Sequence, residues 1–123
     1  MNVDKMVIGQ TYYSADYCGK EPIEIILKEK VKLDDKDKIN EWYKKTLKDD
    51  NYIVSEQQME KILKINQTAL WFDYTDGRDS GDCKIVSPTT RAIDGVVTGI
   101  FDKKEEAEEL MVEWQKEPKG FRA

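Results

Sequence analysis

The sequence contains no histidine among its 123 residues. Histidine is the side chain whose charge normally changes near neutral pH, and it is a frequent general base and metal ligand. Its absence excludes histidine-based catalysis. The two cysteines, Cys18 and Cys83, match no metal-ligand spacing, so we expect free thiols and no bound cofactor.

The sequence also lacks a long apolar run. No segment could span a bilayer, and residues 1–5 have none of the apolar character of a signal peptide. We therefore expect a cytoplasmic protein without membrane contact. The net charge of −5 is unfavourable for contact with phosphate backbones, which argues against direct binding of nucleic acid.

The residues that are present are typical of a globular domain with a charged exterior: 39% are hydrophobic and 37% are charged. A chain of this length buries enough surface to fold without metals or disulfides. No internal repeat or linker divides it, so we predict one α+β domain over residues 1–117. Pro118 and Gly120 end the last predicted helix and leave a short tail over residues 118–123.

Alternating and β-branched residues predict the strands. Residues 6–13 predict the first, and the second follows Pro22, where apolar residues alternate along one face: Ile23, Ile25, Leu27, Val31 and Leu33. These two strands are expected to form a hairpin. Further strands are predicted over residues 52–54, 68–74, 83–87 and 96–101.

Helical spacing of apolar residues predicts three helices. The first has Ile39, Trp42, Tyr43 and Leu47, the second follows a capping box at Ser55, and the third follows one at Asp102. The resulting order is ββα(β)αβββα. The simplest fold is a single antiparallel sheet of four to five strands with about three helices packed on one face.

An acidic loop is the first candidate for chemistry. Aspartates recur at every third position at Asp73, Asp76, Asp79 and Asp82, and clustered carboxylates can bind hard cations. The spacing differs from that of a calcium-binding EF-hand, and Arg78 partly neutralises the cluster. A solvated hairpin tip is the simpler interpretation, and no metal ligand is assigned.

A second candidate combines aromatic residues with arginine, which is scarce and occurs only as Arg78, Arg91 and Arg122. In the strand over residues 68–74, Leu70, Phe72 and Tyr74 face one side and Trp71 faces the other. An exposed Trp71 near loop arginines could stack a base or anchor a protein. A dimer interface or a second packed layer would equally account for it. The candidate ligand-binding residues are Trp71, Tyr74, Arg78, Arg91 and Asp94, with Arg91 placed in a loop over residues 87–91.

Two segments, Tyr52 to Leu63 and Ile100 to Leu110, resemble small Lys- and Glu-rich accessory proteins of low-GC Gram-positive bacteria and their phages. The resemblance covers under a third of the chain. It implies a phage or mobile-element protein that binds and blocks a component of host defence or its nucleotide signal.

These observations support three hypotheses. The first is a non-enzymatic counter-defence inhibitor that contacts a host protein directly. The second is a protein that sequesters a small nucleotide signal, with its ligand held across a homodimer interface or within one chain. The third is a small enzyme that uses carboxylates or a metal, whose activity a chelator would abolish.

Overall fold

The computed structural model describes residues 1–16, 20–75 and 89–116, and these residues form one antiparallel sheet of five strands. The strand order is β4-β3-β2-β1-β5, with β1 paired to both β2 and β5. The strands are β1 (Thr11–Ser14), β2 (Ile23–Lys32), β3 (Gln67–Tyr74), β4 (Thr89–Ile93) and β5 (Ile100–Phe101). The predicted α+β class with a single antiparallel sheet is confirmed.

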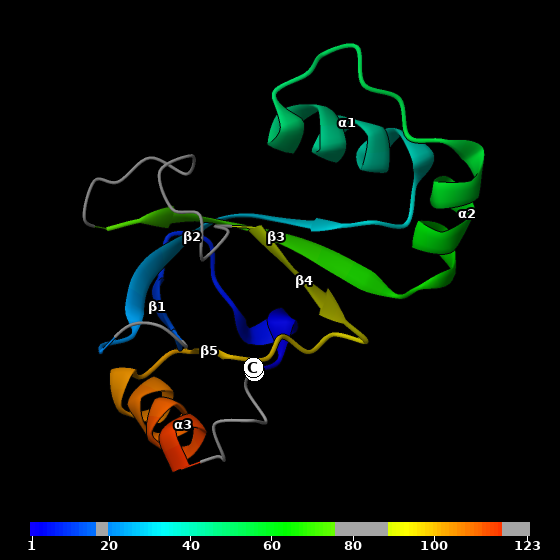
Figure 1. Ribbon diagram of the computed structural model, residues 1–123. Helices are drawn as coiled ribbons and strands as arrows, with labels where there is room; N and C mark the ends of the chain where they lie inside the picture. The colour runs from blue at the N-terminus through cyan, green and yellow to red at the C-terminus, as the bar shows by residue number, and fades with distance from the viewer. Residues whose placement is uncertain (17–19, 76–88, 117–123) are drawn as a thin grey trace.

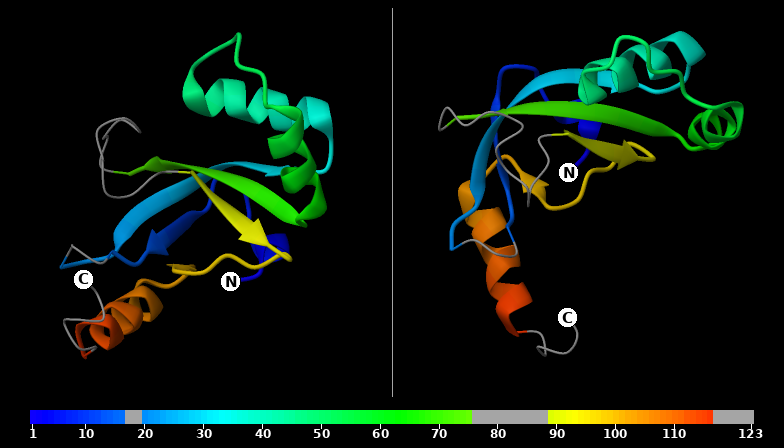
Figure 2. Two further views of the ribbon diagram at one scale, coloured as in Figure 1. Left: turned by 45° about the vertical axis from the view of Figure 1, so that its right-hand side comes forward. Right: turned by 45° about the horizontal axis from the view of Figure 1, so that its top comes forward.

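Within these described ranges, three α-helices and one short 3-10 helix accompany the sheet: η1 (Val3–Lys5), α1 (Lys36–Leu47), α2 (Glu56–Lys64) and α3 (Lys104–Lys116). Figure 1 shows α1 and α2 together over β2 and β3, whereas α3 lies beside β1 and β5 at the other end of the sheet. The views in Figure 2 agree. The helices therefore form two separate groups around a curled sheet. No helix in the described ranges is long and apolar enough to cross a membrane.

Local signals in the sequence explain where α1 and α2 begin. The side chain of Asp35 accepts hydrogen bonds from the backbone N–H groups of Asp37 and Lys38 at the start of α1. The hydroxyl of Ser55 accepts one from the N–H of Gln58 at the start of α2. Each cap satisfies a donor that has no partner within its helix.

A β-bulge in β2 changes which residues face which side of the sheet. The pairing with β3 shifts register between Leu27 and Glu29, so the alternation of faces is interrupted there. Leu27 pairs with Phe72 on one face, whereas Val31 pairs with Ala69 on the other. The prediction that Ile23 to Leu33 share one apolar face was therefore wrong, because one extra residue exchanges the two faces.

The sheet consequently packs a hydrophobic cluster on each face. The inner cluster lies under the curl of the sheet and comprises Val3, Met6, Tyr12, Ile25, Leu27, Leu70, Phe72, Tyr74, Ala92, Val97 and Ile100. The helix-side cluster lies between the sheet and α1 and α2, and comprises Leu33, Ile39, Trp42, Val54, Met59, Ile62 and Ala69. Strand β3 contributes alternate residues to the two clusters, so it packs against hydrophobic side chains on both of its faces.

Two predicted strands are shorter than expected. The first begins at Thr11 because Gly9, with φ of 94°, turns the chain after η1. The last consists of Ile100 and Phe101, since Gly99 with φ of 79° separates them from the preceding residues. Val96 makes only isolated bridges to Asn2 and Ile93.

The segment over residues 52–54 is not a strand. Val54 is buried in the helix-side cluster, and its N–H donates to the side-chain oxygen of Asn40 in α1 at 3.1 Å. Tertiary contacts with α1 thus replace strand pairing. The predicted strand over residues 83–87, the acidic loop beyond residue 75, both cysteines and the tail over residues 118–123 lie outside the described residues.

Candidate functional site

Two of the predicted site residues, Trp71 and Arg91, lie on the same face of the sheet. Arg91 pairs with Ala69, and Trp71 pairs with Thr89, across the antiparallel β3–β4 ladder. Residues that pair directly, and those two apart on one strand, share a face. Arg91 was expected in a loop. It instead belongs to β4, and this regular position fixes it on the side of α1 and α2.

Tyr74 lies on the opposite face, in the inner cluster, where only 7% of its surface is exposed. It is three positions from Trp71 on the same strand, so the alternation of side chains separates the two. The structure therefore does not bring Tyr74 together with Trp71, and a ligand-binding role for Tyr74 stays a prediction. Arg78 lies outside the described residues.

Asp94 occupies a tight turn at the other end of β4. Asp94 and Gly95 have φ of 53° and 78°, and Ile93 and Val96 exchange two backbone hydrogen bonds of 3.1 Å. Positive φ at both central positions is typical of a two-residue hairpin turn, for which Asp-Gly is a preferred pair. The structure therefore gives Asp94 a conformational role, away from the Thr89 end of β4 that pairs with Trp71.

The surroundings of Trp71 come from α1 and β2. The ring of Trp42 in α1 meets it edge-on, with centroids 5.9 Å apart and an angle of 80° between the planes. The ammonium groups of Lys28 and Lys45 each lie 5.8 Å from the Trp71 ring centroid. Lys28 reaches this position because the β2 bulge lies opposite Trp71, and bulges commonly redirect side chains at functional sites.

Arg91 forms a second aromatic contact beside the first. Its guanidinium carbon lies 5.2 Å from the ring centroid of Tyr43, and its terminal nitrogen donates to the Tyr43 hydroxyl. Tyr43 in turn stacks on Tyr52, with centroids 6.0 Å apart and an angle of 23°. The ring of Tyr43 and its hydroxyl group therefore both orient the guanidinium. The planar shape of this group allows it to contact a ring and to donate a hydrogen bond together.

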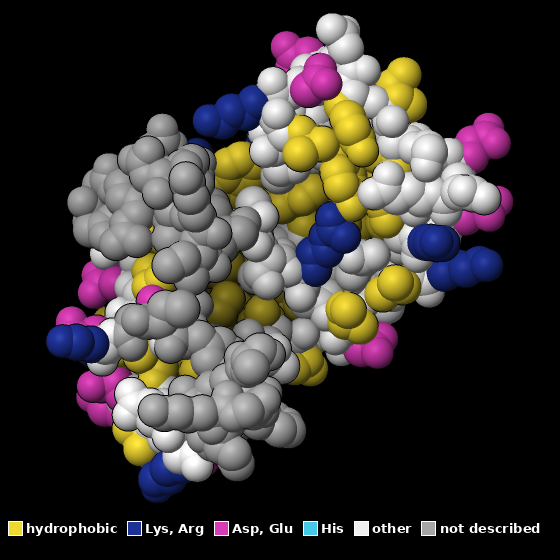
Figure 3. Space-filling model, viewed as in Figure 1, with side chains coloured by type: hydrophobic (Ala, Val, Ile, Leu, Met, Phe, Trp, Pro, Cys, Tyr) yellow, Lys and Arg dark blue, Asp and Glu magenta, His cyan; other side chains and the backbone are white. Residues whose placement is uncertain are grey.

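We name this surface the aromatic–cation face, formed by Lys28, Trp42, Tyr43, Lys45, Tyr52, Trp71 and Arg91. Trp42 is buried, the other aromatic residues are half-buried, and the three cationic side chains are exposed. Figure 3 shows hydrophobic side chains gathered between α1 and the strands, with a basic side chain over them. The face therefore offers solvent-accessible positive charge above an apolar surface.

Sequence reasoning found only Trp71 and Arg91 of this face. The adjacent pair Trp42 and Tyr43 was visible in the sequence, but its helical spacing indicated core packing alone. Tyr52 and the two lysines carried no signal, because their position depends on how α1 crosses the sheet and on the bulge in β2. Local patterns do not specify either feature.

Trp71 also has an unsatisfied polar atom. Its indole nitrogen Nε1 is enclosed, and it has no hydrogen-bond acceptor among the residues that the structure describes. An enclosed donor without an acceptor is costly, so most such groups in folded proteins have partners. The indole N–H is therefore the one buried side-chain donor in the described ranges that the fold itself leaves unused.

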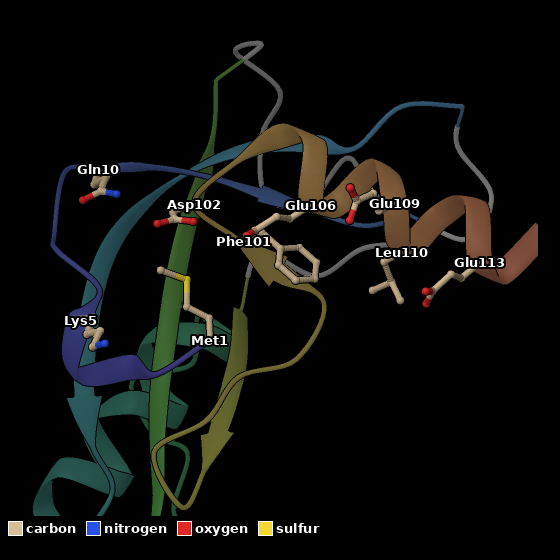
Figure 4. A pocket seen from close by; sticks show the side chains of 9 residues that line it. All are labelled: Met1, Lys5, Gln10, Phe101, Asp102, Glu106, Glu109, Leu110 and Glu113. Atoms are coloured by element: carbon tan, nitrogen blue, oxygen red, sulfur yellow. The ribbon is translucent and has the colours of Figure 1, made fainter.

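A separate pocket of about 590 Å³ lies at the other end of the molecule. Figure 4 shows Phe101 and Leu110 on its apolar side and acidic side chains of α3, among them Glu106, Glu109 and Glu113, around it. Lys5 and Gln10 line it from the N-terminal segment. None of the predicted site residues that the structure describes belongs to this pocket. Its carboxylates give this end of the molecule the opposite charge to the aromatic–cation face.

The described residues contain no group of three carboxylate or thiol side chains close enough to hold a metal ion. Asp73 is exposed on β3, and the other aspartates of the predicted acidic loop lie beyond the described residues. Comparison with protein-family models, curated proteins and solved structures finds no match to this chain.

Proposed function

We propose that this protein is a non-enzymatic binding protein that acts by direct contact with another protein through the aromatic–cation face. One observation carries the proposal: Arg91 over Tyr43, and Lys28 and Lys45 over Trp71, present three exposed cations on rings of a single face. Such a surface combines the charge that attracts a partner with the apolar area that retains it.

The residue types support a protein partner. Tryptophan, tyrosine and arginine are the residues most enriched among those that dominate binding energy in protein interfaces. Here they stand on regular elements, because Trp71 and Arg91 belong to paired strands and Tyr43 belongs to α1. Binding residues on strands and helices are held more rigidly than residues on loops, so less conformational entropy is lost on binding.

The resemblance to accessory proteins of low-GC Gram-positive bacteria and their phages supplies the biological setting of this proposal. In that setting the partner is a host protein, and the binding blocks a component of host defence in the host cytoplasm. The aromatic–cation face is the part of the molecule that would cover the host protein.

Sequestration of a nucleotide is the alternative, and the pairing of ring faces with cations favours it as a second candidate. A base can stack on an aromatic ring while arginine or lysine binds phosphate. The alternative is weakened because Tyr74 and Asp94, two of its predicted ligands, lie away from Trp71. A nucleotide would have to be held by Trp71 and Arg91 with the lysines.

The proposal is tested by capture of binding proteins from lysates of low-GC Gram-positive bacteria. We expect the wild-type protein to retain a discrete protein, and the Arg91→Ala variant to retain about tenfold less, as for an interface residue of high energy. The Lys104→Ala variant is the control, because it removes a positive charge from exposed α3. Circular dichroism verifies that each variant is folded.

The proposal fails if Arg91→Ala and Lys104→Ala retain the same proteins in equal amounts. A thermal-shift panel of nucleotides and cyclic dinucleotides is run in parallel. An increase in melting temperature that Arg91→Ala abolishes would establish the nucleotide alternative instead, since a ligand that binds only the folded state stabilises it.

A further inference from the structure

We infer that the partner binds the aromatic–cation face through an acidic segment, a stretch of chain with several carboxylates. This inference rests on the proposed function and names the chemistry of the partner. Lys28, Lys45 and Arg91 are all exposed on this face, although the chain as a whole has a net charge of −5. Such a local concentration of positive charge favours an anionic partner and repels a basic one.

The face already binds one carboxylate of its own. Glu29 forms an ion pair with Lys45, and both side chains are partly exposed, at 32% and 47% of their surface. An ion pair at such a position contributes little net stability, because water solvates and screens both charges. A partner's carboxylate can therefore replace Glu29 beside Lys45 at small cost. The internal pair shows the kind of group that the site accepts.

The indole N–H of Trp71 gives a second and independent reason. It is an enclosed donor without an acceptor in the described structure, and Lys28 and Lys45 lie over the same ring. A carboxylate is purely an acceptor when ionised, so it can accept from an indole N–H and an ammonium together. Because the indole nitrogen is enclosed, a partner's carboxylate reaches it only when the side chains over the ring move aside. Lys28 and Lys45 lie over that ring and both are exposed, so they can turn towards a partner without disturbing the core.

The other charges of the molecule limit where an acidic segment can lie. Asp73 is exposed on the same face, two residues beyond Trp71, and it bounds the positive region on that side. At the α3 end, Glu106, Glu109 and Glu113 line the acidic pocket and repel the same segment. An acidic partner is thus repelled from the α3 end and favoured in the region around Lys28, Lys45 and Arg91.

The experiment is a titration of the ¹⁵N-labelled protein with a hexaglutamate peptide, followed by NMR of the indole N–H signals. The chain has three tryptophans, so three such signals are expected, and Trp71→Phe identifies the one from Trp71. We expect the Trp71 proton to move downfield as it gains an acceptor, while the Trp114 signal in α3 stays unchanged. Hexalysine should leave all three signals in place.

Charge variants measure the contribution of each group. We expect Lys28→Ala and Lys45→Ala each to weaken hexaglutamate binding about threefold or more, as for charges at an interface, and Lys104→Ala to leave it unchanged. Glu29→Gln should strengthen it about twofold, because an internal competitor for Lys45 is removed. Added salt should weaken binding to the wild-type protein.

Two results would overturn the inference: a Trp71 signal that hexaglutamate does not move, or equal binding of hexalysine. If protein capture still depends on Arg91 in that case, the proposed function stands and only the acidic partner is wrong. If capture is also independent of Arg91, the aromatic–cation face is not the binding surface and both proposals fail.

Discussion

At the scale of single residues, Lys30 is a charged side chain that stabilises the packing of the N-terminal segment against the sheet. The bulge in β2 places Lys30 opposite Leu70, on the inner face of the sheet. Its ammonium group donates to the backbone oxygens of Val3 and Met6, at 3.3 Å and 3.1 Å. Val3 begins the short η1 segment and Met6 follows its last residue, so Lys30 ties both ends of this turn to the sheet.

We expect Lys30→Met to lower the free energy of unfolding by about 1–2 kcal/mol, because methionine keeps the apolar stem but leaves two carbonyl oxygens without their charged donor. Urea denaturation measures the change. Lys32→Met is the matched control, since Lys32 is exposed on the same strand and has no such bonds among the described contacts. Equal effects of the two variants would show that the bonds to Val3 and Met6 contribute nothing.

At the scale of elements, the Asp94–Gly95 turn determines how β4 ends and how the chain returns towards β5. Both residues have positive φ, and the N–H of Asp94 donates to the oxygen of Asn66 at 2.8 Å, just before β3 begins. The turn thus fixes the β4 end against the start of β3. This holds the register that places Arg91 opposite Ala69 on the aromatic–cation face.

We expect Gly95→Ala to destabilise the protein by about 1–2 kcal/mol, because a residue with a Cβ is strained at positive φ. A Cβ at this position would meet no heavy atom within 4 Å, so steric overlap with neighbours does not contribute. Asp94→Gly is the control and should change stability by less than about 0.5 kcal/mol, since aspartate already tolerates this conformation. Thermal unfolding compares the two, and a neutral Gly95→Ala would contradict the strained-turn explanation.

At the scale of the whole molecule, stability is distributed unevenly. Strands β2 and β3 are covered on both faces, because the inner cluster and the helix-side cluster pack against opposite sides of them. Helix α3 buries only Ala107 and Met111 and packs against the short strands β1 and β5. Local opening requires less free energy where fewer apolar contacts are broken.

We therefore expect the backbone amides of β3 to exchange with solvent most slowly and those of α3 distinctly faster. Native-state hydrogen exchange measured residue by residue tests this order. Amides of β3 should exchange only through global unfolding, whereas those in α3 exchange through local opening. Equal protection in α3 and β3 would show that α3 unfolds only together with the rest of the domain.

The sequence by itself determined the elements whose signals are local. The capping residue Ser55 marked the start of α2, and alternation in β3 assigned Phe72 to the core and Trp71 to the other face. These features depend on contacts within a few residues, which is why patterns in the chain reveal them. The class of fold followed from their order.

Only the tertiary structure decided which residues from distant parts of the chain lie in contact. The bulge opposite Trp71 exchanged the faces of β2 and brought Lys28 to the ring, and no period-two pattern could indicate it. The crossing of α1 over the sheet brought Tyr43 to Arg91, although the two are far apart in the chain. The candidate site arises from such long-range placement, because strand register and helix packing are set by the whole core rather than by neighbouring residues.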